Sequence, residues 1–208
     1  GSAARLKSPE SSMPHSNSRS LKKNRELLRL YDGGAVFTAF DTETTGLNAE
    51  KDRLLEIGAV KFTKDGVVAI YNQLINPCCP LSPAAMAVNN ITLDMVKDCP
   101  TEDQVLPGFI DFISDSILVA HNSSFDVKFV NAALGRHGHQ PLNNQIEDTV
   151  KTSRASFPEL ERYNLQFLAQ HFGINPGKAH RATDDARVCM EVLLRCIRQC
   201  PGSCGEEE

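Results

Sequence analysis

The chain has 208 residues, of which 41% are hydrophobic and 23% are charged, and its formal net charge at pH 7 is −4. These values are typical of one soluble globular domain with a sizeable core. They exclude a membrane-spanning protein, because no apolar run approaches the roughly 20 residues that cross a bilayer. The polar first 20 residues contain no apolar signal core, so we expect a cytoplasmic protein with no membrane partner.

The negative net charge also bears on nucleic-acid binding. Contacts to phosphates usually come from Lys and Arg, and a slightly acidic chain is therefore not an obvious nucleic-acid binder. Bound cations would reverse this argument, because they change the sign of the local charge.

The seven cysteines are odd in number and lack Cys-x-x-Cys spacing. Cys196, Cys200 and Cys204 recur every four residues, as metal ligands on a helix could do. However, Pro201 and Gly202 should break the helix before the last of them, and no histidine lies nearby. We therefore expect reduced thiols rather than a zinc site or disulfides.

The chain begins with a segment unlike the rest. Residues 1–20 contain seven serines and no apolar periodicity, which predicts disorder. The basic stretch 21–31 can form a short helix that packs Leu27, Leu28 and Leu30 onto the domain. The expected division is a disordered or partly helical arm at 1–32, a folded domain that contains the candidate site at 33–200 and a short acidic tail at 201–208.

Strands and helices alternate through the domain. Segments 35–40, 54–62 and 67–75 predict three strands of a meander, with a turn at Lys64-Asp65-Gly66. A fourth strand is expected at 116–121. Helices are expected near 92–97, at 101–114, at 123–134, at 163–173 and from Thr183, as N-cap, to Gln199. This order predicts an α/β domain with a mixed sheet covered by helices.

Two acids, Asp41 and Glu43, follow the first predicted strand in "AFDTETTGL". Residues two apart in a strand share a face, about 6.6 Å from each other. Like charges that close resist ionising together unless a cation lies between them. The alternative is an ordinary solvated strand end.

Three more residues stand out further along the chain. Asp126 lies in the first turn of an otherwise apolar helix, and His180 and Asp185 flank the start of the last helix. Each has an ordinary reading, as a helix-dipole acid or a loop histidine. Asp185 falls in line with apolar positions of its helix, whereas Asp184 falls on a more solvated row, so Asp185 is the better candidate for chemistry.

Strand ends and helix starts at one edge of an α/β sheet are where such domains build their sites. If the four acids meet there, their oxygen ligands suit Mg²⁺ or Mn²⁺. Two such ions can stabilise the attacking and leaving oxygens of a phosphodiester. Histidine gains and loses a proton near neutral pH, so His180 could accept the proton of the attacking water.

Three motifs, "FDTETTGL", "AHNSSFD" and "HRATDDA", resemble in order and spacing the exonuclease motifs of the DnaQ-like family, the DEDDh class of 3′→5′ exonucleases. The resemblance covers about residues 35–198. It implies a ribonuclease-H-like fold with two metal ions per active site. It makes His180 the general base and four acids the metal ligands: Asp41, Glu43, Asp126 and Asp185.

The resemblance also implies a place for the substrate. It would set the backbone of Thr44, Thr45, Gly46 and Leu47 against the terminal nucleotide, with Leu47 as an apolar wedge beside its base. Asn122 and Phe125 would line the same groove, although turn chemistry and core packing are their ordinary readings. His121 is expected to be a structural histidine.

Three functions remain open at this point. The leading one is 3′→5′ hydrolysis of single-stranded or frayed DNA 3′ ends, releasing nucleoside 5′-monophosphates, either alone or beside a DNA polymerase catalytic subunit. The second is the same chemistry on RNA 3′ ends or short oligoribonucleotides. The third is a non-catalytic nucleic-acid-binding module. Some members of the family dimerise, so a homodimer is also considered.

Overall fold

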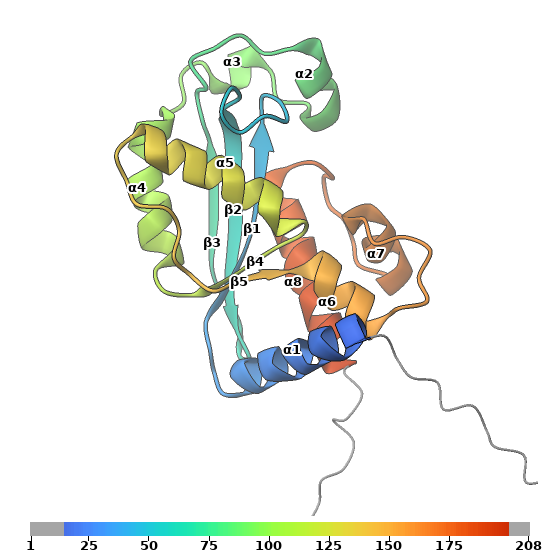
Figure 1. Cartoon of the computed structure of the whole chain (residues 1–208). Coiled ribbons are helices and arrows are strands. Elements are labelled where there is room, and N and C mark those ends of the chain that lie inside the picture. Colours follow the sequence, from blue (N-terminus) through green and yellow to red (C-terminus); the bar gives the residue numbers. More distant parts are fainter. Residues whose placement is uncertain (1–14, 200–208) are drawn as a thin grey trace, which may run out of the picture.

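The computed structural model describes residues 15–199, with backbone only for residues 15–17 (Figure 1). The predicted acidic tail, Cys200 and Cys204 lie outside the described residues. The elements run in the following order: α1 His15–Asp32, β1 Phe37–Thr44, β2 Leu54–Thr63, β3 Gly66–Leu74, α2 Pro83–Asn89, α3 Leu93–Val96, α4 Glu102–Ile113, β4 Ile117–Ala120, α5 Ser123–Arg136, β5 Ile146–Asp148, α6 Thr149–Ser156, α7 Leu165–Phe172 and α8 Ala182–Arg198.

The five strands form one mixed sheet in the order β3-β2-β1-β4-β5. β1 pairs with β2 and β2 with β3 in antiparallel register, which is the predicted meander. β4 pairs with β1 and β5 with β4 in parallel register. The α/β prediction with a mixed sheet covered by helices is therefore confirmed.

Alternation along β1 divides the core between the two faces of the sheet. Phe40 points to the face covered by α4 and α5, where it packs among Phe109 and Phe129. Phe37 and Ala39 point to the opposite face, where they pack against α1 and α8 (Figure 1). Successive strand residues point to opposite faces, so the acids at positions 41 and 43 continue the α8 side.

α1 begins at His15 and not at residue 21, so the predicted disorder is wrong for residues 15–20. Its inner side packs on the domain: Leu27 is fully buried, and Leu28 and Leu30 are partly buried against the same cluster. Residues 1–14 lie outside the described part.

α2, β5 and α6 were not predicted from the sequence, and α8 begins two residues earlier than predicted. The N-cap of α8 is Arg181 and not Thr183. No helix within residues 15–199 combines the length and apolar character needed to cross a membrane. The five cysteines of the described part are free, and Cys196 is buried among apolar side chains of α7 and α8.

Candidate active site

The two acids of the first motif lie within β1 rather than after it, because β1 continues pairing with β2 as far as Thr44. Glu43 is 8% exposed, and Asp41 is partly buried. Asp185, in the first turn of α8, is buried opposite them. One carboxylate oxygen from each of Asp41, Glu43 and Asp185 lies within 4.8 Å of the other two.

Asp126 reaches β1 from α5. Its Oδ1 accepts hydrogen bonds from the backbone N of Thr42 at 2.9 Å and from Thr42 Oγ1 at 2.6 Å. Thr42 lies between the two acids of β1, so these bonds bring Asp126 next to them, and Asp126 is the acidic neighbour that most raises the pKa of Asp41. Asp126 is 3% exposed.

The carboxylates strongly disfavour one another's charge. Burial raises the pKa of Asp41 well above its ordinary value, and its acidic neighbours raise it further. Burial likewise raises the pKa of Glu43 to about 8, of Asp126 to about 7 and of Asp185 to about 6.

One atom of this cluster has no partner within the chain. Among the described residues, Asp41 Oδ2 is a buried side-chain oxygen without a hydrogen-bond donor. A buried carboxylate oxygen normally has a donor or a cation beside it. The unpartnered atom and the mutual repulsion of the acids fit a site for a hard divalent cation, which takes oxygen ligands.

His180 lies at the edge of this cluster. Its side chain is exposed, and its backbone has a left-handed φ of 61°. The backbone N of His180 donates to Asp185 Oδ2 at 3.1 Å, which joins the histidine to the acid cluster.

The residue after His180 is tied to the sheet. Arg181 donates to the fully buried carboxylate of Glu56 through Nε at 3.1 Å and Nη2 at 2.8 Å. The same carboxylate accepts the backbone N–H of Ala182 at 2.9 Å. Glu56, in β2, therefore caps α8 from outside the helix, which explains why Thr183 is not the cap. Gly58 permits this approach, because a Cβ there would lie 2.2 Å from the backbone N of Thr183.

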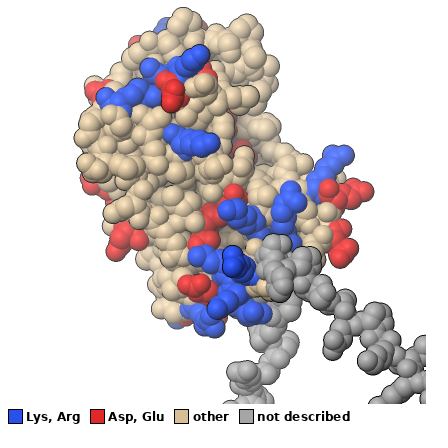
Figure 2. All heavy atoms as spheres, viewed as in Figure 1, with Lys and Arg blue, Asp and Glu red and all other residues tan. Residues whose placement is uncertain are grey.

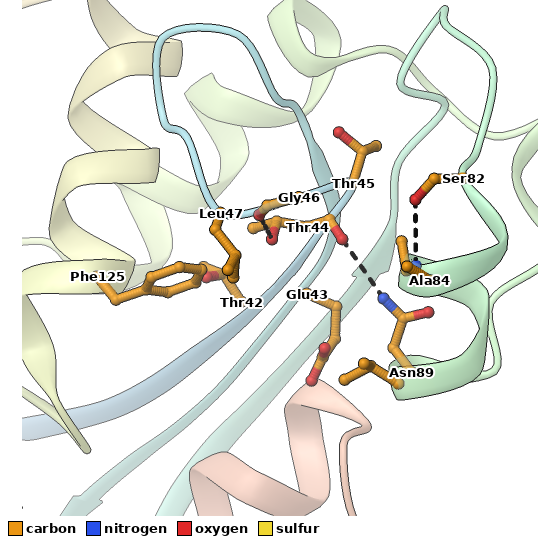
Figure 3. A pocket seen from close by; sticks show the side chains of 12 residues that line it. Thr42, Glu43, Thr44, Thr45, Gly46, Leu47, Ser82, Ala84, Asn89 and Phe125 are labelled. Carbon is orange, nitrogen blue, oxygen red and sulfur yellow. Dashed lines mark hydrogen bonds between the residues drawn. The ribbon is translucent and has the colours of Figure 1, made fainter.

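A cavity of about 340 Å³ adjoins the acids through Glu43 (Figure 3). Its lining comes from the end of β1, the following turn, α2 and α5: Thr42, Glu43, Thr44, Thr45, Gly46, Leu47, Ser82, Ala84, Ala85, Val88, Asn89 and Phe125. Leu47 is 86% exposed, and its side chain lies beside the Phe125 ring (Figure 3). Two apolar groups thus stand at the rim of the cavity, one of them almost fully open to solvent.

The turn that carries Leu47 is held by two contacts. Thr45 Oγ1 accepts the backbone N–H of Arg53 at 2.9 Å, and buried Asn89 lies 3.5 Å from the Thr44 carbonyl. The Asp52 carboxylate lies close over Gly46, and a Cβ there would force that side chain to move.

Asn122 and His121 precede α5. Asn122 is exposed, adopts a left-handed φ of 61° and borders a second hollow together with Leu47 and Phe125. Both ring nitrogens of His121 have partners, Thr149 Oγ1 and the Tyr163 carbonyl, each at 2.7 Å. Burial lowers the pKa of His121. These contacts agree with its predicted structural role.

Residues 38–193 match the protein family described as Exonuclease. The chain belongs to this family. It is a DnaQ-like 3′→5′ exonuclease, a hydrolase of phosphodiester bonds, as the three motifs predict.

Two curated relatives illustrate its neighbours in sequence. The chain is 48% identical over 164 residues to the DNA polymerase III subunit epsilon of Treponema pallidum (strain Nichols), covering 78% of this chain and 76% of that subunit. It is 38% identical over 157 residues to the DNA polymerase III PolC-type of Clostridium perfringens (strain 13 / Type A), covering 76% of this chain and 11% of that protein. The chain therefore spans only about a tenth of that PolC-type relative.

Two solved structures are similar to this fold. Exonuclease X in complex with 5′ overhanging duplex DNA has a TM-score of 0.63 and 30% identity, covering 80% of this chain and 93% of that one. E. coli exonuclease I in complex with a dA16 oligonucleotide has a TM-score of 0.69 and 18% identity, covering 79% of this chain and 42% of that one. The exonuclease has the expected ribonuclease-H-like fold.

Three residues that support the site were not predicted from the sequence. Thr42 holds Asp126, and the Glu56–Arg181 pair anchors the residue next to His180. Glu56 is the lone acid of the mainly apolar β2, which indicates a buried partner without revealing which residue it is.

Proposed function

We propose that the exonuclease removes nucleoside 5′-monophosphates one at a time from DNA 3′ ends, with Asp41, Glu43, Asp126 and Asp185 holding two Mg²⁺ or Mn²⁺ ions. The observation that supports the metal ligands is the buried, unpartnered Asp41 Oδ2 inside a cluster of acids whose pKa values are raised. Such ions, when bound, stabilise the charge that develops on the oxygens of a phosphodiester in hydrolysis.

His180 is proposed as the general base that takes the proton of the attacking water. Its exposed ring can meet solvent and substrate, while its backbone is fixed to Asp185. The Arg181 contact with Glu56 restrains the residue that follows His180 and so limits where the histidine backbone can lie. Positioned proton transfer of this kind contributes about 10²–10⁴-fold to a rate.

The cavity beside Glu43 is proposed to receive the last nucleotide. Its walls from Ala84, Ala85 and Val88 suit a base without reading its identity, because stacking and apolar contact are sequence-tolerant. Leu47 and Phe125 would separate the last base from its neighbour, and Asn122 would border the strand. Thr44, Thr45 and Gly46 would face the nucleotide with their backbone.

Similarity to a polymerase epsilon subunit supports a proofreading role beside a DNA polymerase catalytic subunit. In that role the protein would work in the cytoplasm. The homodimer stays a prediction.

The proposal is tested by digesting a 5′-labelled single-stranded DNA and a matched RNA in Mg²⁺, Mn²⁺ or EDTA. We expect a ladder that shortens from the 3′ end of the DNA and disappears in EDTA. Asp41→Asn should abolish cleavage, and His180→Ala should lower kcat by at least about 100-fold. His171→Ala, an exposed histidine on α7, is the matched control and should be fully active. Full activity of both site variants would overturn the assignment, and faster cleavage of RNA would replace DNA as the substrate.

A further inference from the structure

α1 lies outside the region that matches the exonuclease family, which begins at residue 38. Apolar packing holds it to the domain through Leu27 and Tyr31. Asn24 fixes it further: it is 1% exposed and donates from Nδ2 to the Thr152 carbonyl at 3.0 Å and to Ser156 Oγ at 2.8 Å, both in α6. α1 and α6 therefore form one fixed surface.

This surface is basic on a protein whose net charge is −4. α1 and α6 together contain seven Lys or Arg and two acids, and α6 contains no acid. The cations are exposed: Arg19, Lys22, Lys23, Arg25 and Arg29 in α1, and Lys151 and Arg154 in α6. Figure 2 shows Lys and Arg gathered in the lower part of the molecule, where Figure 1 places α1 and α6. We call these seven residues the basic surface.

A hollow lies between the basic surface and the first residue of α5. This cavity, of about 320 Å³, is lined by Ser20, Lys23 and Lys151 at the basic surface and by Ser123 at the start of α5. Ser123 directly follows Asn122, and Asp126 lies in the same helical turn. The start of α5 therefore borders this hollow through Ser123 and contributes Asp126 to the acids.

The acids of the hollow have partners already. Glu147 pairs with Lys23 at 3.1 Å, and Asp148 accepts backbone N–H groups of Asn122, Ser123 and Val150. Lys151 makes no ion pair or hydrogen bond within the described residues. Two lysines and two acids line the hollow, so its formal charges cancel, and the excess positive charge lies on the surrounding basic surface.

From the fixed helix, its charge and the adjoining hollow, we propose that the basic surface binds the phosphate backbone of the strand whose 3′ end is being digested. The inference rests on the proposed function, because it deepens the description of the same substrate. It also gives an acidic protein the cations that phosphate contacts need. Binding at this surface adds affinity for long strands and leaves the chemical step unchanged.

The test compares Lys23→Gln/Lys151→Gln with a control of equal charge change, Lys64→Gln/Lys97→Gln, whose residues are exposed and lie in the β2–β3 turn and beside α3. Glutamine at position 23 can still hydrogen-bond Glu147. Hydrolysis is measured on a 30-nucleotide DNA and on the p-nitrophenyl ester of thymidine 5′-monophosphate, which reaches only the active site. DNA binding is measured separately by fluorescence anisotropy in EDTA, from 50 to 200 mM salt.

We expect the first variant to raise KM and Kd for the long strand about tenfold at 50 mM salt, with kcat and hydrolysis of the small ester unchanged. Loss of two phosphate contacts should make the salt dependence of log Kd shallower by about 1.4. The control variant should match the wild type.

An unchanged Kd and salt slope in the first variant would overturn the inference and leave the surface to an acidic protein partner. An equal loss on the small ester would overturn it too, because the effect would then lie in the active site. Failure of the wild type to hydrolyse either substrate would instead contradict the proposed function.

Discussion

Removing the Arg181 side chain should destabilise the exonuclease far more than removing an ordinary surface cation. Arg181→Ala deletes both guanidinium donors to Glu56, whose side chain is 0% exposed. The carboxylate would keep only the Ala182 N–H and a long contact of 3.4 Å from Asn72. The charge would thus be left buried without a counter-ion.

The magnitude follows from the geometry. Breaking a fully buried ion pair costs about 3–5 kcal/mol, because one charge stays desolvated and unpaired. The Arg181 side chain is 29% exposed, so water can partly replace it, and we expect a loss of about 2–3 kcal/mol. Glu56→Gln in the same chain removes the buried charge, and it should recover part of the loss.

The assay is urea unfolding followed by circular dichroism, since the chain has no tryptophan. Lys97→Ala is the control, because its pair with Asp94 is exposed on both sides and should contribute no more than about 0.5 kcal/mol. If Arg181→Ala costs no more than this control, the pair is not a determinant of stability. If adding Glu56→Gln to the Arg181→Ala variant lowers its stability further, an unpaired buried charge is not the cause of the loss in Arg181→Ala.

Three other changes test separate features. Gly58→Ala should lower the free energy of unfolding by about 3 kcal/mol and remove most of the activity, because the new Cβ would collide with the backbone of α8. Unfolding and turnover equal to those of the wild type would contradict this. Leu47→Ala should change unfolding by less than about 0.5 kcal/mol, since the side chain is 86% exposed, but slow DNA digestion several-fold in a gel assay; unchanged digestion would remove its role as a wedge. In EDTA, the melting temperature should fall as pH rises from 5 to 8. The pKa values of Glu43 and Asp126 are raised, so in this range the folded state holds protons that the unfolded state has released. Mg²⁺ should therefore stabilise the protein more at pH 8 than at pH 5, and a melting temperature that does not change with pH would refute this.

The sequence predicts those parts of the fold with strong periodicity. The alternating and apolar runs of β1–β3 and the apolar stripe of α8 decide their own structure, and both were found close to the predicted bounds. Of the four predicted acids, Asp41, Glu43 and Asp185 have carboxylate oxygens within 4.8 Å of one another, and Asp126 is bonded to Thr42 between the first two. Strand ends and helix starts meet at one sheet edge, which is why the sequence could indicate this, and the role of the acids as metal ligands stays a prediction.

Elements with few apolar residues could not be predicted in the same way. β5 has three residues, and α6 reads "TVKTSRAS", in which tertiary contacts and a capping Asp148 replace hydrophobic periodicity. The serines at the start of α1 suggested disorder, yet the helix is fixed by contacts with α6 and α8 that lie far away in sequence. The Glu56–Arg181 pair spans 125 positions, and no local pattern reveals it.

The early end of β4 has a consequence for where catalysis can take place in this fold. β4 accompanies β1 only from Phe37 to Ala39, and it ends at Ala120. Beyond that point a carboxylate, Asp126, accepts the Thr42 N–H that a longer β4 could have bonded. The active centre therefore lies beside the last residues of β1, in the space that β4 leaves by ending early. Extending β4 by two residues would complete the ladder and close the space in which the acids meet.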